Sequence, residues 1–292
     1  RFVYGLLAAG GTLGILIPPS IPMIVYGFVT EESIISLFLA GIVPGLLLIV
    51  LFTIFAMVYA RFSPGYQKMD PASWAERLST SIRALPSVLL AVVVIGGLYS
   101  GAFTPTEAAA VGFAVALVIT IFILRTLTWA AFKEAAFDAM VTTVAILLII
   151  AGAKVFGKAI ALYRIPQDIS AFLGANIDGP IAFILVVSVV LLLMGLVFEA
   201  LSMVLIMVPV LLPAALALGF DPIWFGVYVV IMVECALITP PVGLNLYVIQ
   251  SVARTTLGEV SRGVLPFLAI MLATVVALYA VPDIALYVPF KW

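Results

Sequence analysis

The chain carries the run Ile238-Thr239-Pro240-Pro241-Val242-Gly243-Leu244-Asn245 in the middle of an apolar stretch that extends from Ile223 to Val252. Two adjacent prolines break a helix at that point, because proline lacks a backbone donor and its ring blocks the preceding turn. Inside a lipid bilayer the freed carbonyls are tolerated only where protein or a water-filled cavity surrounds them. The run therefore predicts a broken helix whose break lines a binding site.

A second interruption of the same kind lies near the N-terminus, in the run Gly14-Ile15-Leu16-Ile17-Pro18-Pro19-Ser20. Two interrupted apolar segments in corresponding positions of two halves are typical of the midplane site of a secondary transporter. The alternative is that both runs are ordinary proline kinks, since proline is frequent in transmembrane helices.

The composition identifies the class of protein. Hydrophobic residues make up 65% of the 292 residues and charged residues only 9%, whereas charged residues are about a quarter of a soluble domain. The chain is therefore an integral membrane protein embedded in a lipid bilayer. Its net charge of -1 gives no indication of nucleic-acid binding. With no histidine and a single cysteine, Cys235, the usual zinc and copper sites are not expected.

Apolar runs and polar links divide this all-α, polytopic membrane protein into six segments. In order, they are a broken helix of a first repeat (1–33, transport domain), a transmembrane helix (34–60), a cytoplasmic linker with an amphipathic helix (61–85), scaffold-type helices of a second repeat (86–179), a re-entrant hairpin with the second broken helix (180–253, transport domain), and a last transmembrane helix with the C-terminal tail (254–292).

Three local patterns refine this division. Apolar residues recur at helical spacing opposite charged ones from Trp74 to Leu85, which predicts an amphipathic helix along the membrane interface. A separate crossing is expected to begin at Pro86. The run Thr104-Pro105-Thr106-Glu107 predicts a helix start with threonine as the N-cap and glutamate as its capping partner. Residues 125–138 are expected to form a polar link before a span from Met140 to Tyr163.

The long apolar stretch from Ile181 to Leu218 is better explained by a hairpin than by one helix. A straight helix of that length would measure about 55 Å, nearly twice the ~30 Å hydrocarbon core. We expect a hairpin that turns near Phe198 to Leu201 and leaves by the side it entered. This topology also places most basic loop residues on one side of the membrane, which agrees with the positive-inside rule.

The two halves of the chain are unequal. The second half reads as three crossings, a re-entrant hairpin, a broken helix and a crossing, whereas the first half supplies only a broken helix and a crossing. An inverted repeat would need on the order of 140 further residues upstream. We therefore expect the natural protein to be longer at its N-terminus.

Four runs resemble the large membrane subunit of TRAP (tripartite ATP-independent periplasmic) transporters, a DctM-like family of the ion transporter superfamily. They are the stretch Gly10 to Gly27 around Pro18-Pro19, the stretch Leu37 to Gly45, the run Gly101 to Ala108, and the run Leu237 to Asn245. The hairpin stretch Met194-Gly195-Leu196-Val197-Phe198-Glu199 is similar too, although many members carry aspartate where this chain has Glu199.

The resemblance implies a transport domain that moves like an elevator against a scaffold in the bacterial inner membrane, with sodium as the coupling ion and no other cofactor. It also implies two protein partners, which are a small four-helix membrane subunit and a periplasmic substrate-binding protein. The implied function is uptake of an organic acid anion such as a dicarboxylate or sialic acid.

The breaks themselves suggest where the ion and the anion bind. Exposed carbonyls of an unwound helix are hard oxygen ligands for sodium, while the N-termini of half-helices attract an anion. The candidate sodium ligands are Ile17, Pro18, Ser20, Ser202, Ile238 and Thr239, and the candidate substrate-binding residues are Ile21, Gly243, Leu244 and Asn245. The alternative for Ser20 and Thr239 is that their hydroxyls only cap the broken helices.

Two carboxylates in apolar segments are further candidates, since such groups are costly there and functional by default. Glu234 precedes the second break by about one turn and is interpreted as a ligand or as a hairpin latch. Glu199 and Gly195 lie at the centre of the hairpin stretch. Lys154 and Lys158 either contact the anion or extend towards the outer interface.

Two other functions are weighed against this one. A related sodium/carboxylate symporter would capture its substrate without a binding protein. A membrane-embedded enzyme lacks support, because the sequence contains no histidine and no nucleophile beside a base.

Overall fold

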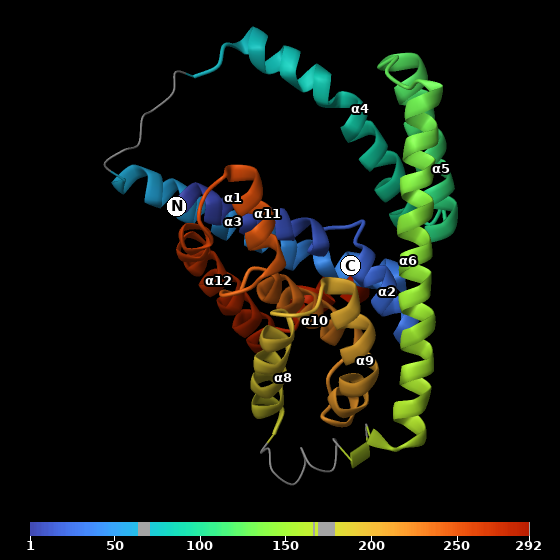
Figure 1. Ribbon diagram of the computed structural model, residues 1–292, viewed down its shortest axis with the longest axis vertical. Coiled ribbons are helices and arrows are strands. Elements are labelled where there is room, and N and C mark those ends of the chain that lie inside the picture. Colours follow the sequence, from blue (N-terminus) through green and yellow to red (C-terminus); the bar gives the residue numbers. More distant parts are fainter. Residues whose placement is uncertain (64–70, 166, 169–178, 292) are drawn as a thin grey trace. The chain divides into compact units, whose positions relative to one another are not determined.

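A computed structural model describes residues 1–63, 71–165, 167–168 and 179–291, and the described part is helical without a strand. The chain forms two compact units, one from residues 1–60 and 149–292 and one from residues 61–148. The elements, most of them labelled in Figure 1, are α1 (Phe2–Leu16), α2 (Ile21–Thr30), α3 (Ile34–Phe62), α4 (Trp74–Tyr99), α5 (Pro105–Val118), the π-helical η1 (Ile119–Ile123), α6 (Trp129–Leu162), α8 (Pro180–Met194), α9 (Ala200–Ala217), α10 (Pro222–Leu237), α11 (Leu244–Ala253), α12 (Leu257–Ala280) and α13 (Asp283–Lys291).

Both predicted breaks are present. α1 ends at Leu16 and α2 begins at Ile21, so the chain leaves the helix across Pro18-Pro19. α10 ends at Leu237 and α11 begins at Leu244, on either side of Pro240-Pro241. The peptide bond between the two prolines is cis in both breaks.

Helix α10 is the central element of the first unit. Every residue from Ile223 to Leu237 is buried, because α1, α2, α8, α9, α11, α12 and α13 all pack against this helix. Three of its polar groups bond to neighbouring helices. Tyr228 shares a hydrogen bond of 2.8 Å with Ser188 of α8, and the Trp224 indole donates to the carbonyl of Leu278 in α12 at 3.1 Å. Tyr26 of α2 donates to the carbonyl of Pro222 at 2.6 Å.

Helices α1 and α12 approach so closely that only glycine fits between them. A methyl group added at Gly5 would lie 1.9 Å from the carbonyl oxygen of Gly263. Small residues of this kind let two membrane helices bring their backbones into contact, where packing replaces the hydrophobic effect. Aromatic rings close the same interface, since Phe267 of α12 meets Phe52 and Phe55 of α3 edge to face. The first broken helix is thereby held against the last long helix.

The hairpin prediction agrees with the fold, although the turn is earlier than expected. α8 and α9 lie side by side in Figure 1, joined by residues 195–199. The turn was placed near Phe198 to Leu201, but α9 already begins at Ala200. The reason is the Glu199 carboxylate, which accepts hydrogen bonds from the backbone N–H groups of Leu201 and Ser202 and so starts the helix.

In the second unit, two helix boundaries differ from those expected from the sequence. No break separates a helix ending at Leu85 from one beginning at Pro86, because α4 is continuous across that point and starts at a capping box of Ser73 and Glu76. A single internal proline costs about 3 kcal/mol, which well-formed turns on both sides can offset. The link expected over 125–138 is also shorter, since α6 begins at Trp129. The linker residues 64–70 lie outside the described part.

The predicted start of α5 is confirmed in detail. Thr104 accepts a hydrogen bond from the Glu107 amide at 3.3 Å, and the Glu107 carboxylate accepts from the Thr104 amide at 2.9 Å. Pro105 occupies the first helical position. Glu107 is therefore a capping residue of α5, as its place in the sequence indicated.

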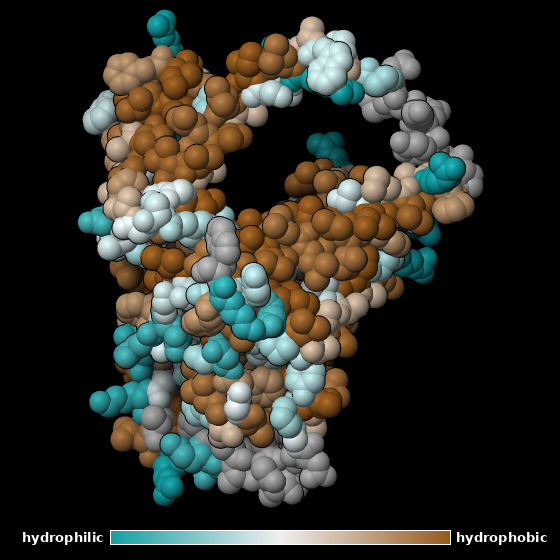
Figure 2. Space-filling model, turned by 180° about the vertical axis from the view of Figure 1, so that it is seen from behind, coloured by the Kyte–Doolittle hydropathy of each residue, from teal (hydrophilic) through white to brown (hydrophobic). Residues whose placement is uncertain are grey.

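Within the described residues, seven helical segments are long and apolar enough to cross a membrane. Apolar side chains cover much of the face seen in Figure 2, as lipid contact requires. Helix α8 has 15 residues and measures about 22 Å, too short for the ~30 Å core, which favours re-entry of the hairpin. Helix α9, with 18 residues, is long enough to span.

Candidate functional site

The first break is closed by Ser20. Its hydroxyl donates to the carbonyl of Ile15 and accepts from the Met23 amide at 3.3 Å, so it links the end of α1 to the start of α2. The side chain is almost wholly buried, with 1% of its surface exposed. Ser20 therefore caps α2 in this structure, which is the alternative role that the sequence analysis gave for its hydroxyl.

The second break brings two main-chain carbonyls together. Gly243 has φ +21°, and a methyl group added to it would lie 2.8 Å from the Leu237 oxygen and 3.0 Å from the Thr239 oxygen. The Thr239 hydroxyl donates to the Cys235 carbonyl at 2.6 Å and closes the last turn of α10. These carbonyl oxygens are hard ligands of the type that alkali cations prefer. They lie so close to Gly243 that a side chain at this position would collide with them.

Helix α11 begins at this break without a side-chain cap. Gly243 occupies the N-cap position and offers no side chain to the first amides of the helix. The next two residues, Leu244 and Asn245, carry amides that point out of the helix end, which is a favourable place for an anion. The corresponding residue of the first break, Ile21, follows the Ser20 cap and is 54% exposed.

The tip of the hairpin packs directly on the end of α10. A methyl group added at Gly195 would lie 2.3 Å from the Cβ of Ala236 and 2.9 Å from its backbone. The tip therefore lies beside the last turn before the second break. Glycine is needed at this position because any side chain would push the hairpin away.

The last turn of α1 meets α10 on another side. The backbone N–H of Leu16 lies near the Glu234 carboxylate, one turn before Ile238. Gly41 of α3 approaches from a third direction, since a methyl group there would lie 2.8 Å from the Leu16 carbonyl oxygen. We call this meeting of the α1 end, the α10 end and the hairpin tip the break junction, defined by Leu16, Gly195, Glu234 and Ala236.

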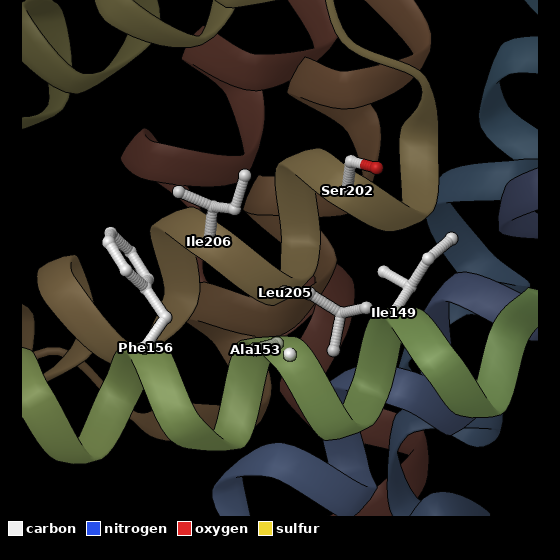
Figure 3. A pocket seen from close by; sticks show the side chains of 7 residues that line it. Ile149, Ala153, Phe156, Ser202, Leu205 and Ile206 are labelled. Atoms are coloured by element: carbon white, nitrogen blue, oxygen red, sulfur yellow. The ribbon is translucent and has the colours of Figure 1, made fainter.

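Most of the predicted sodium ligands lie in the two breaks beside this junction, but Ser202 does not. Its hydroxyl donates to the Glu199 carboxylate at 2.8 Å in the first turn of α9. Ser202 also lines a cavity of about 250 Å³ between α9 and the C-terminal part of α6. The other side chains in Figure 3 are apolar, among them Leu205 and Phe156, so this cavity offers a cation few ligands.

Lys154 of α6 lies over the Phe28 ring of α2, with its ammonium nitrogen 4.5 Å from the ring centre. A cation over an aromatic face is a favourable contact in its own right. In this structure Lys154 therefore contacts an aromatic side chain of α2.

The sequence did not single out three of the residues that shape the site. Leu16 and Leu237 contribute main-chain groups, and the role of such groups cannot be predicted from a pattern of side chains. Gly41 carries a weak signal, because Gly41 and Gly45 are spaced one helical turn apart, and both face the end of α1. Glycines at such spacing are a known sign of close helix contact.

Comparison with protein-family models matches residues 1–284 to the family described as tripartite ATP-independent periplasmic transporter, DctM component. The chain belongs to this family. It is therefore a transporter permease and not an enzyme, and it lies in the bacterial inner membrane. TRAP large permeases in general work with a small membrane subunit and a periplasmic binding protein.

Curated TRAP large permeases cover nearly the whole chain. The C4-dicarboxylate TRAP transporter large permease protein DctM of Pseudomonas aeruginosa is 39% identical over 99% of this chain and 67% of the relative. The sialic acid TRAP transporter large permease protein SiaM of Vibrio cholerae is 38% identical over the same shares. The 2,3-diketo-L-gulonate TRAP transporter large permease protein YiaN of Escherichia coli is 35% identical, again over 99% and 67%. The chain spans about two thirds of the length of these relatives.

Proposed function

We propose that this TRAP large permease couples sodium entry to the uptake of an organic acid anion. The observation that supports sodium coupling most strongly is the approach of the Leu237 and Thr239 carbonyl oxygens to Gly243 in the second break. The carbonyls of Ile17 and Pro18 offer the same kind of ligand in the first break, and Ile238 follows the last turn of α10. Sodium bound there would neutralise the partial negative charge that carbonyls carry at a helix C-terminus.

The anion is proposed to bind at the start of α11, beside the same break. The uncapped amides of Leu244 and Asn245 provide donors, and the Asn245 side-chain amide supplies another. The relatives that are named for their substrates include transporters of C4-dicarboxylate and sialic acid. A carboxylate on the substrate would lie at the positive end of α11, close to the sodium that balances its charge.

Alternating access is proposed to follow an elevator mechanism. The two broken helices and the hairpin would move together as the transport domain, since α10 packs against α1, α2, α8, α9 and α11. The helices of residues 86–179 would form the scaffold. A small four-helix membrane subunit would accompany the permease, and a periplasmic binding protein would deliver the substrate.

The proposal is tested by uptake into proteoliposomes that contain the permease, its small subunit and the added binding protein. Labelled C4-dicarboxylate and sialic acid serve as probes. We expect uptake of one probe in an inward sodium gradient, and loss of that uptake when potassium replaces sodium, because carbonyl sites built for sodium fit the larger ion poorly. Uptake that continues unchanged in potassium would refute sodium coupling.

The same assay distinguishes a TRAP transporter from the alternative sodium/carboxylate symporter. A TRAP transporter requires its binding protein, whereas an independent sodium/carboxylate symporter would accumulate the probe without it. Uptake of equal rate in the absence of the binding protein would favour that alternative.

A further inference from the structure

A second cavity, of about 340 Å³, lies at the end of the first unit where α9 ends, α10 begins and α12 ends. Its walls include Phe220 and Asp221 of the α9–α10 connection, Trp224 of α10, Tyr279 of α12 and Leu286 of α13. We call this cavity the headgroup pocket and define it by these five residues. The function proposed above uses none of them.

Asp221 is the one charged residue among the described residues that line the headgroup pocket. Its Oδ1 atom accepts hydrogen bonds from the amides of Ile223 at 2.8 Å and Trp224 at 3.0 Å, so it caps α10. The helix dipole and these amides stabilise a negative charge at this position. The other oxygen, Oδ2, accepts no hydrogen bond from the described part of the chain. The half-buried carboxylate therefore keeps an acceptor for a ligand.

Three aromatic rings form the wall beside this carboxylate. Phe220 stacks on Trp224 with 5.1 Å between the ring centres, and Tyr279 lies at an angle to both, 6.3 Å from Phe220 and 6.4 Å from Trp224. Trp224 is buried, whereas Phe220 and Tyr279 are half-buried and leave ring surface for a ligand. Aromatic faces attract cations, and an ammonium group is bound best where a carboxylate is also present. The pocket therefore suits an amine and repels an organic acid anion.

The surroundings of the headgroup pocket place it at the membrane interface. Helix α12 is long and apolar enough to cross a membrane and ends one residue after Tyr279. Tyrosine and tryptophan at the ends of such helices lie at the level of the lipid headgroups. Large apolar side chains that are more than half exposed lie on the same elements, namely Val276 of α12, Val281 after it, and Tyr287 and Phe290 of α13. These side chains need lipid tails to cover them.

We propose that the headgroup pocket binds the ammonium group of phosphatidylethanolamine, whose acyl tails cover the exposed side chains of α12 and α13. The primary ammonium donates an N–H to Asp221, and its charge lies against the rings of Phe220 and Tyr279. A choline headgroup has the charge but no N–H donor, and a glycerol headgroup has no positive charge. The pocket should therefore prefer phosphatidylethanolamine to phosphatidylcholine, and either of them to phosphatidylglycerol. Lipid binding here does not depend on the sodium coupling proposed above.

Photochemical labelling of the purified permease in nanodiscs tests this preference. The discs consist of phosphatidylglycerol with a small fraction of phosphatidylethanolamine that carries a diazirine near its headgroup, and mass spectrometry maps the labelled peptides. We expect labels on residues 218–224 and 279–286. Unlabelled phosphatidylethanolamine should suppress the labelling, and phosphatidylcholine should need about a tenfold higher fraction, because it lacks the hydrogen bond to a charged group.

Asp221→Asn separates recognition of the amine from capping of the helix. Asparagine caps a helix about as well as aspartate does, so the melting temperature without phosphatidylethanolamine should stay close to that of the wild type. Labelling of the pocket should fall about tenfold, since the charge is lost. The matched control Glu107→Gln replaces another capping carboxylate by an amide outside the pocket and should label as the wild type does. Tyr279→Leu should reduce labelling about twofold to fivefold, because it removes one ring.

Four results would overturn the lipid site. They are labelling of Asp221→Asn at the wild-type level, competition by phosphatidylglycerol as strong as by phosphatidylethanolamine, equal protection of the pocket by soluble phosphoethanolamine, which would assign it to a free amine, and protection by the periplasmic binding protein with no labelling by lipid, which would assign it to a protein partner. If Asp221→Asn does not fold, the order of the three competing lipids on the wild type decides the question.

Discussion

Gly243→Ala is expected to abolish sodium-dependent uptake while leaving the permease folded in the membrane. The added methyl group would lie 2.8 Å from the Leu237 oxygen and 3.0 Å from the Thr239 oxygen, at a backbone φ of +21° that alanine rarely adopts. One or both carbonyls must move, and a displacement of about 1 Å in a positioned group can cost about a hundredfold in rate. Uptake of the labelled probe in an inward sodium gradient provides the measurement.

Gly14→Ala is the matched control for Gly243→Ala. It adds the same methyl group within one turn of the first break, but apart from its chain neighbours and the backbone of its own helix no atom lies within 4 Å of the new position. This variant should transport at a rate close to that of the wild type. If Gly243→Ala transports as well as Gly14→Ala does, the carbonyls of the second break do not form the sodium site.

Gly195→Ala is expected to separate the hairpin tip from the second break. Its methyl group would lie 2.3 Å from the Cβ of Ala236, well inside van der Waals contact, and the backbone of Ala236 leaves little room for relaxation. Overpacking of this kind costs about 1–3 kcal/mol. We expect a lower melting temperature, measured in detergent or nanodiscs, together with a weaker stabilising effect of sodium.

The exchange variant Gly195→Ala with Ala236→Gly tests whether this contact is responsible. Moving the methyl group from one partner to the other restores part of the space, so the two substitutions should destabilise less than the sum of the single ones. Strictly additive losses of stability would show that the tip and α10 are not in contact in the membrane.

The helix breaks could be predicted from the sequence because their cause is local. Pro18-Pro19 and Pro240-Pro241 remove donors and block turns whatever surrounds them, and the Thr104 cap likewise depends on residues three apart. The hairpin could be predicted because length in a bilayer is a strong constraint. These features require no knowledge of which helices become neighbours.

The predictions that failed concern features that depend on more than local sequence. Pro86 was expected to begin a new crossing, but α4 continues through it. The prediction failed because composition does not show whether two flanking helical segments can compensate for one lost hydrogen bond. The approach of Leu16 to Glu234 joins residues far apart in the sequence through a main-chain amide. Ser202 and Glu199 were treated as separate candidates, yet they bond to each other as parts of one helix cap.

An experimental map of the permease in lipid nanodiscs, obtained by electron cryomicroscopy in sodium, tests the central claim most directly. We predict that Leu16 and Glu234 will be in contact, that Gly195 will lie against Ala236, and that density for an ion will lie beside the Leu237 and Thr239 carbonyls. A map in which the two proline breaks lie far apart, or in which either break faces lipid as a simple bend, would contradict the account.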